Sequence, residues 1–177
     1  MQIQSMEKEW RLEGLGASGP YPSLEDKLSL FGQFVGDWII LEDHSFQEDG
    51  TETLVDGELH WEWILEGKAV QDVWMFRDKK TKKIIPAGTT VRMYDPKIDA
   101  WQSIWFTTER HEVLSFIGRK IGEEIVLEGR NHENNLLRWI FSDITPNSFT
   151  WRGEKSKDLG KTWMTRELMK IRRKEVP

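Results

Sequence analysis

Apolar and polar residues alternate along most of the chain between Gly36 and Lys174. The segment Leu59–Leu65 is a clear example, because apolar residues occupy every second position around His60 and Glu62. Side chains on a strand point to opposite faces in turn, so Trp61 and Trp63 are expected to share one face with Leu59. The pattern predicts β-strands rather than helices.

Turn-forming residues interrupt this alternation often enough to divide it into about ten strands. Examples are Glu48-Asp49-Gly50 and Pro86-Ala87-Gly88. The connections are too short for crossover helices, so neighbouring strands should form antiparallel hairpins. Closure would remove the exposed edges of such a meander. We therefore predict an all-β fold, a ten-stranded antiparallel up-and-down β-barrel, with a two-sheet sandwich as the alternative. The predicted strands are 37–47, 51–65, 68–77, 89–95, 100–107, 112–118, 123–130, 136–144, 148–156 and 162–172.

The N-terminal part of the chain does not show this alternation of apolar and polar residues. Residues 1–22 are rich in glycine and proline and are predicted to be a flexible arm. Ser23 is placed as a helix N-cap, and Leu24, Leu28 and Phe31 follow at helical spacing. We predict a capping helix at about 24–34 that ends before Gly36, and a single barrel domain over residues 23–177.

Some strands have apolar residues on both faces. Val73 and Met75 alternate with Trp74 and Phe76, and Ile104 lies between Trp101 and Trp105 on another strand. The barrel interior would cover one face, and a partner subunit or the N-terminal helix would cover the other. A homodimer is therefore one expectation, and simple crowding of aromatic residues on the sheet is the alternative.

Composition narrows the class of protein. The chain has 177 residues, 38% of them hydrophobic, with a net charge of −5 and no cysteine. The acidic balance argues against nucleic-acid binding. No stretch of apolar residues is long enough for membrane insertion, and the N-terminus does not resemble a secretory signal. The expectation is a cytoplasmic protein without disulfides or thiolate metal sites.

Ten tryptophans are the main functional signal. Indole rings on strands combine a large apolar area with one N–H donor, and they predict an aromatic-lined cavity or a protein interface. Asp72 shares a face with Trp74, and Arg92 on the next strand is its expected partner, either as a ligand anchor or as a structural ion pair. The predicted ligand-binding residues are Trp61, Trp63, Asp72, Trp74, Arg92, Trp105, Arg130 and Trp151.

Further arginines lie on the late strands. Arg130, Arg138 and Arg152 are each more typical of an exposed strand position, but at least one of the set is expected to point inward and bind a carboxylate. His60 and Glu62 share a face and would suit a metal or an acid–base pair. Two ligands are too few for a metal site, and an exposed pair is favoured. No metal and no cofactor is predicted.

The segment Phe34-Val35-Gly36-Asp37-Trp38 resembles the opening of the calycin superfamily of lipocalin and fatty-acid-binding-like barrels. Together with Asp49-Gly50-Thr51, residues 61–67 and residues 70–74, it is similar to bacterial lipocalin-like proteins of unknown function over residues 24–172. The resemblance implies that Trp38 closes the barrel and that a basic residue of the last strand, here Arg166, packs over it. Nitrobindin-like members bind haem through a histidine near the last strands, but no histidine lies between Asn147 and Pro177.

These observations predict a protein that binds a small organic molecule, largely apolar or aromatic and planar or carboxylated, inside a barrel. One alternative is a cofactor-independent isomerase, cyclase or dehydratase in the same cavity, with Asp72 or His60 as the base. Another is a dimeric assembly protein without a ligand, because tryptophan is enriched at interfaces.

Overall fold

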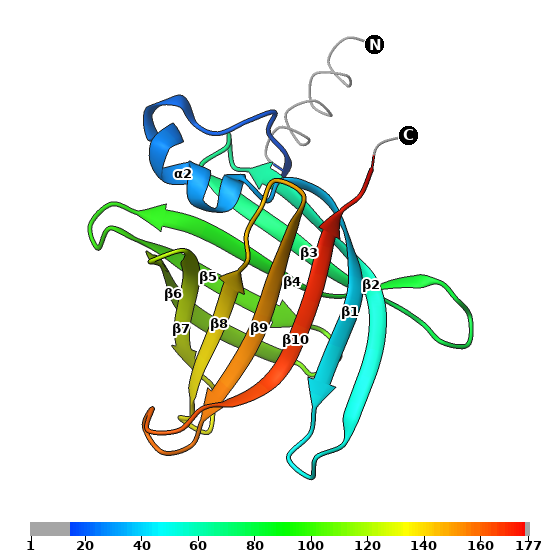
Figure 1. Cartoon of the computed structure of the whole chain (residues 1–177). Coiled ribbons are helices and arrows are strands. Elements are labelled where there is room, and N and C mark those ends of the chain that lie inside the picture. The colour runs from blue at the N-terminus through cyan, green and yellow to red at the C-terminus, as the bar shows by residue number, and fades with distance from the viewer. Residues whose placement is uncertain (1–14, 176–177) are drawn as a thin grey trace.

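The computed structural model describes residues 15–175, which form one closed barrel of ten antiparallel strands. Each strand pairs with its neighbours in sequence, and β1 also pairs with β10 to complete the ring (Figure 1). The strands are β1 (Gly36–Phe46), β2 (Glu52–Ile64), β3 (Ala69–Arg77), β4 (Ile84–Asp95), β5 (Ala100–Thr107), β6 (Glu112–Ile121), β7 (Glu124–Arg130), β8 (Leu136–Ser142), β9 (Ser148–Ser156) and β10 (Met164–Arg173). The predicted ten-stranded antiparallel barrel is confirmed, and the sandwich alternative is wrong.

The turn predicted at Pro86-Ala87-Gly88 is wrong, because these residues lie inside β4. An irregularity in the β3–β4 pairing between Trp74 and Met75 accommodates the proline there. The chain instead reverses between β3 and β4 at Asp78–Lys83, where the backbone N–H of Asp78 donates to the carbonyl of Lys83 over 2.9 Å. This placement lengthens β4 at its N-terminal end.

A short helix, α2 (Glu25–Gly32), closes one end of the barrel (Figure 1). Its buried residues Leu28 and Phe31 come from the predicted apolar stripe. The residue before the helix is Leu24, and Ser23 lies within a preceding 3₁₀ turn, η1 (Pro22–Leu24), so the predicted serine cap is not present. Gly32 allows the Trp63 indole to pack on the helix, because a Cβ there would lie 2.4 Å from Trp63 Cζ2.

The described part of the predicted arm is hydrogen-bonded to the barrel. The N–H of Ala17 donates to the carbonyl of Trp63 over 2.8 Å, and the N–H of Tyr21 donates to the carbonyl of Gly67 over 3.0 Å. These bonds attach residues 17–21 beside α2. Residues 1–14, which make up most of the predicted arm, lie outside the described residues.

Aromatic side chains fill the barrel beneath α2 and form its floor. Phe31 and Phe34 reach down from the helical segment to pack against Trp61 and Phe141, with ring centroids 5.2 to 6.5 Å apart. Trp38 is also buried there, and its indole N–H donates to the carbonyl of Phe34 over 2.6 Å. The floor is therefore solid.

The basic residue over Trp38 is Arg173, which corrects the assignment to Arg166. Trp38 and Arg173 are register partners, whereas Arg166 lies toward the other end of β10. The Arg173 guanidinium lies 4.0 Å from the Trp38 ring centroid and donates to the carbonyls of Val35 and Gln33. The C-terminal end of β10 is thereby connected to the helical end of the barrel.

A bulge in β1 changes which side chains face inward. Trp38 and Ile40 point into the barrel, and the register then shifts between Ile40 and Asp43. Leu41 is 51% exposed, as alternation with Trp38 and Ile40 requires, whereas Asp43 is buried because of the shift. The bulge thus directs an acidic side chain into the interior.

The outer face of β5 remains uncovered in the monomer. Ile104 is 49% exposed and Phe106 is 43% exposed, because α2 covers the end of the barrel and not this face. Within residues 15–175, no helix is long and apolar enough to cross a membrane.

Candidate functional site

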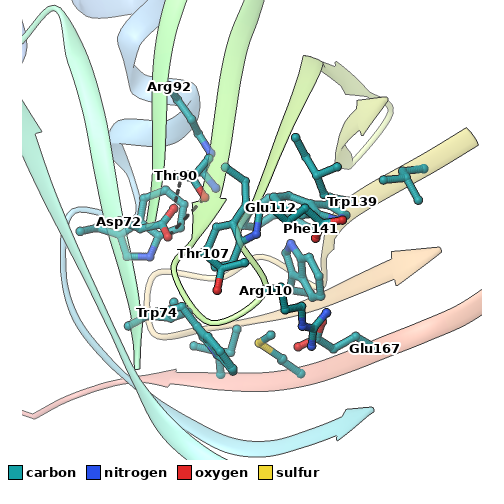
Figure 2. Close-up of a pocket in the computed structure, with 18 of the residues that line it drawn as sticks. Asp72, Trp74, Thr90, Arg92, Thr107, Arg110, Glu112, Trp139, Phe141 and Glu167 are labelled. Atoms are coloured by element: carbon teal, nitrogen blue, oxygen red, sulfur yellow. Dashed lines mark hydrogen bonds and ion pairs between the residues drawn. The ribbon is translucent and has the colours of Figure 1, made fainter. Parts of the chain in front are cut away.

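A cavity of about 260 Å³ lies in the barrel above the aromatic floor and continues toward the end opposite α2. Its walls come from β2 to β6 and from β8 to β10, and the turn between β5 and β6 lies at its mouth. The side chains that line it are mainly aromatic and aliphatic, with a few charged groups (Figure 2). The apolar members are Leu59, Trp61, Trp74, Trp105, Leu114, Leu137, Trp139, Phe141, Phe149, Trp151, Met169 and Ile171.

Three indoles form a continuous wall on one side. The Trp139 ring lies 5.7 Å from that of Trp105 at 81°, and 5.5 Å from that of Trp151 at 65°. Small residues leave room for these rings: a Cβ at Gly88 would lie 2.1 Å from Trp105 Cη2, and a Cβ at Gly153 would lie 3.0 Å from Trp151 Cη2. The neighbouring glycines therefore let the indoles lie against the barrel wall.

Asp72 and Arg92 form a buried ion pair just above the floor. Each is at most 3% exposed, and Arg92 Nη1 donates to Asp72 Oδ2. The guanidinium also lies over the Trp61 ring, 4.4 Å from its centroid. Burial raises the pKa of Asp72, but the charge of Arg92 opposes this shift. A guanidinium keeps its proton in proteins, and the charge and hydrogen bond of Arg92 favour the ionised Asp72 carboxylate, so the two opposite charges offset each other.

Unpaired donors surround this ion pair. Arg92 Nε, Trp61 Nε1 and Trp74 Nε1 are buried without a hydrogen-bond partner among the described residues. Each such group costs about 1–3 kcal/mol of stability. The floor of the cavity is therefore polar in part and is not optimised for stability alone, which is typical of functional sites.

A second polar group lies near the mouth, where Glu167 lines the cavity beside Asp43. Burial, reinforced by the neighbouring Asp43 carboxylate, raises the pKa of Glu167 to about 8, and the positive charge of Arg110 opposes this shift. Burial likewise raises the pKa of Asp43 to about 6. Two carboxyl groups this close favour sharing one proton at neutral pH, so they titrate as a pair.

The structure brings most of the predicted site residues together. Trp61, Asp72, Trp74, Arg92, Trp105 and Trp151 all line this one cavity. Trp63 lies elsewhere, between the floor and α2, because its position on β2 is beyond the end of the cavity.

The predicted inward arginine is not found on the late strands. Arg130 is exposed and donates to the carbonyl of Asn134 over 3.0 Å, because it shares its strand face with exposed Glu128 rather than with buried Leu127. Arg138 stacks on Trp163 outside the barrel, and Arg152 pairs with Glu124. None of these three arginines lines the cavity, and the inward guanidinium above the floor is that of Arg92.

His60 and Glu62 lie on the outer face of β2, as favoured from the sequence. His60 contacts Asp37 and lies 3.3 Å from Glu58, a surface arrangement. Among the described residues no cluster of three or more histidine, aspartate or glutamate side chains is placed to hold a metal ion.

Sequence reasoning missed several residues in or beside the site, and Trp139, Glu167 and Asp43 are the most informative of them. Trp139 has the same parity as Phe141 on β8, a signal that was available. Glu167 lies on the same face of β10 as the buried residues Met169 and Ile171, which places it inside the barrel. Asp43 was not predictable from alternation, because the β1 bulge reverses its direction.

Comparison with known proteins found similarity in structure but not in sequence. No protein-family model matches the chain, and no curated protein matches it. Among solved structures, the chain is similar to the S-type phycobiliprotein lyase CPES from Guillardia theta, with a TM-score of 0.58 and 14% sequence identity. The match covers 84% of this chain and 93% of the lyase. At this identity the likeness shows the fold alone, a barrel of the kind that the sequence resemblance implied.

Proposed function

We propose that this calycin-like barrel binds a small, largely apolar organic molecule with an aromatic or planar frame. The observation that carries the proposal is the indole-lined space of about 260 Å³ inside an otherwise packed barrel. Binding cavities are typically apolar and contain a few fixed polar groups, which matches the Asp72–Arg92 pair within the aromatic walls. Pockets for drug-sized ligands measure roughly 300–1,000 Å³. This cavity is slightly smaller, at about 260 Å³, so the guest is a compact molecule of about two fused rings.

The fold likeness to the phycobiliprotein lyase supports a barrel that is able to hold a guest. The lyase's own activity is not carried over, because 14% identity relates the two folds only. A cytoplasmic location and a homodimer both stay predictions. Native mass spectrometry of freshly purified protein measures the subunit number and any retained small molecule together.

The test is a titration with 1-methylnaphthalene, a neutral two-ring probe, followed by tryptophan fluorescence. Saturable binding that weakens about tenfold in Trp139→Ala is the expected result, because the indole supplies a large part of the contact wall. Trp163→Ala is the matched control, since Trp163 stacks on Arg138 outside the barrel. Absence of saturable binding, or equal loss in both variants, would refute a ligand site between the indoles.

One observation favours an enzyme as the second candidate. Glu167 faces the cavity, and burial raises its pKa to about 8, a value suited to proton transfer near neutral pH. This carboxyl replaces the bases considered from sequence, because His60 is on the outer face and Asp72 is paired with Arg92. As a base Glu167 acts in its ionised form, so the rate should rise with pH through an apparent pKa of about 8, and loss of this rise in Glu167→Gln would support turnover.

A further inference from the structure

The mouth half of the cavity has an excess of acidic groups. Glu109, Glu112 and Glu167 line it, and among residues 15–175 the only basic residue that does so there is Arg110. The deeper guanidinium, that of Arg92, is already neutralised by Asp72. The cavity therefore offers an anionic guest no uncommitted positive charge near the floor, and its mouth attracts positive charge.

Aromatic faces adjoin these carboxyl groups. The rings of Trp105, Trp139 and Trp151 meet nearly edge to face, at 81° and 65°, so they form a concave aromatic wall. The face of an indole is the part of a protein that attracts an organic cation most strongly without carrying charge. Aromatic walls together with a carboxylate are the chemistry that recognises protonated and quaternary nitrogen.

Glu167 and two of the indoles converge at one point of the wall. Glu167 is paired with Gly153 across β10 and β9, and Gly153 is paired with Trp139 across β9 and β8. Gly153 has no side chain, so the Trp151 ring packs over it. A Cβ at Gly153 would lie 3.0 Å from Trp151 Cη2 and 3.8 Å from Glu167 Cβ, which shows how close these two side chains are. Glu167 and the rings of Trp139 and Trp151 therefore adjoin the same part of the cavity wall.

Asp43 supports Glu167 from behind. It is 2% exposed, and its Oδ1 has no hydrogen-bond partner among the described residues. A buried carboxyl oxygen without a partner is costly, and a bound cation next to the pair would offset part of that cost. Asp43 is not among the residues that line the cavity, so its charge acts on a guest through its neighbour Glu167.

We propose that the mouth half of the cavity binds an organic cation, a protonated or quaternary nitrogen carried on a planar apolar frame. The nitrogen lies between the Glu167 carboxyl group and the rings of Trp139 and Trp151, and the frame extends toward Trp61. This assignment rests on the proposed function and adds the charge of the ligand to it. It replaces the carboxylated ligand considered from sequence.

Binding of a cation is coupled to loss of the proton that the Asp43–Glu167 pair holds. The charged groups that act on the pair are Arg110 at the mouth, which favours the ionised form of Glu167, and His44 on the outer face of β1. A permanent cation should therefore bind more tightly as the pH rises toward about 8, whereas a neutral probe should show little change.

The experiment compares three two-ring probes of similar shape by isothermal titration calorimetry: N-methylquinolinium, 1-methylnaphthalene and 1-naphthoate. At about pH 8 we expect the cation to bind about tenfold more tightly than the neutral probe, and the anion more weakly than either. In Glu167→Gln the ratio of cation to neutral affinity should fall to about one. Glu42→Gln is the matched control, because Glu42 lies on the outer face of the same β1–β10 seam and pairs with Lys170.

Each outcome is decisive. If the neutral probe binds and the cation gains nothing over it, or if the naphthoate is preferred, the cation assignment is overturned and the proposed function stands. If none of the three probes binds, both are overturned. If Glu42→Gln lowers the ratio as much as Glu167→Gln, the preference arises from the general charge of the protein and the assigned contact is wrong. Thermal melting of each variant confirms that the barrel is folded.

Discussion

Replacing Asp72 by alanine tests whether the buried ion pair above the floor is integral to the barrel. Arg92 is 2% exposed, its Nε already lacks a partner among the described residues, and its guanidinium lies against aromatic rings, so the change removes the carboxylate that compensates a buried charge. Breaking a buried pair in this way costs about 3–5 kcal/mol. For a domain of this size, that loss lowers the melting temperature by roughly 6–20 °C.

The double variant Asp72→Leu with Arg92→Met removes both charges and keeps the volume apolar. Its stability should be close to that of the wild type or above it, because no uncompensated charge remains. Urea unfolding followed by tryptophan fluorescence gives the free energies, and unchanged m-values confirm that the variants unfold in the same way. A double-mutant cycle closed with the two single variants Asp72→Leu and Arg92→Met then yields a coupling of several kcal/mol. A cost below about 1 kcal/mol for Asp72→Ala, or additive costs in the double variant, would show that the pair is not a buried, dehydrated one.

Three further predictions follow from the same structure. Because the pKa of Glu167 is raised to about 8, the folded state holds a proton that the unfolded state has already released at neutral pH. The urea midpoint should therefore decrease as the pH is raised from about 5 to about 8, and Glu167→Gln should flatten this dependence. Gly88→Leu should cost on the order of 1–3 kcal/mol and disturb probe binding, because even its Cβ would lie 2.1 Å from Trp105 Cη2; calorimetry and melting temperature measure both effects. Arg173→Met should lower the free energy of unfolding by about 2 kcal/mol, since the cation–π contact with Trp38 and the hydrogen bonds to the helical segment are lost; an unchanged urea midpoint would contradict this.

Much of the site was accessible from alternation alone. Six of the predicted residues line the cavity: Trp61, Asp72, Trp74, Arg92, Trp105 and Trp151. Alternation along one strand is not sufficient at every position. Strand parity shows that two residues share a face. It does not show which face is inside when both faces carry apolar and polar residues, as on the strand of Arg130.

Other features depended on the closed ring. Arg173 reaches Trp38 because β1 and β10 pair at the closure, and a register set by ten strands decides which arginine lies there. The Asp43–Glu167 pair forms across the same seam, after a bulge has reversed the direction of Asp43. Neither the bulge nor the register is encoded in a short window of sequence.

The amino-acid sequence by itself determined the strands, the antiparallel order and the aromatic character of the interior, because these follow from period-two burial and from short turns that act locally. Tertiary structure alone decided that the indoles leave a cavity of about 260 Å³, that its one deep guanidinium is neutralised, and that its mouth is acidic. Those properties arise from side chains brought together by strands distant in sequence, and their charges and volumes combine only when the barrel closes.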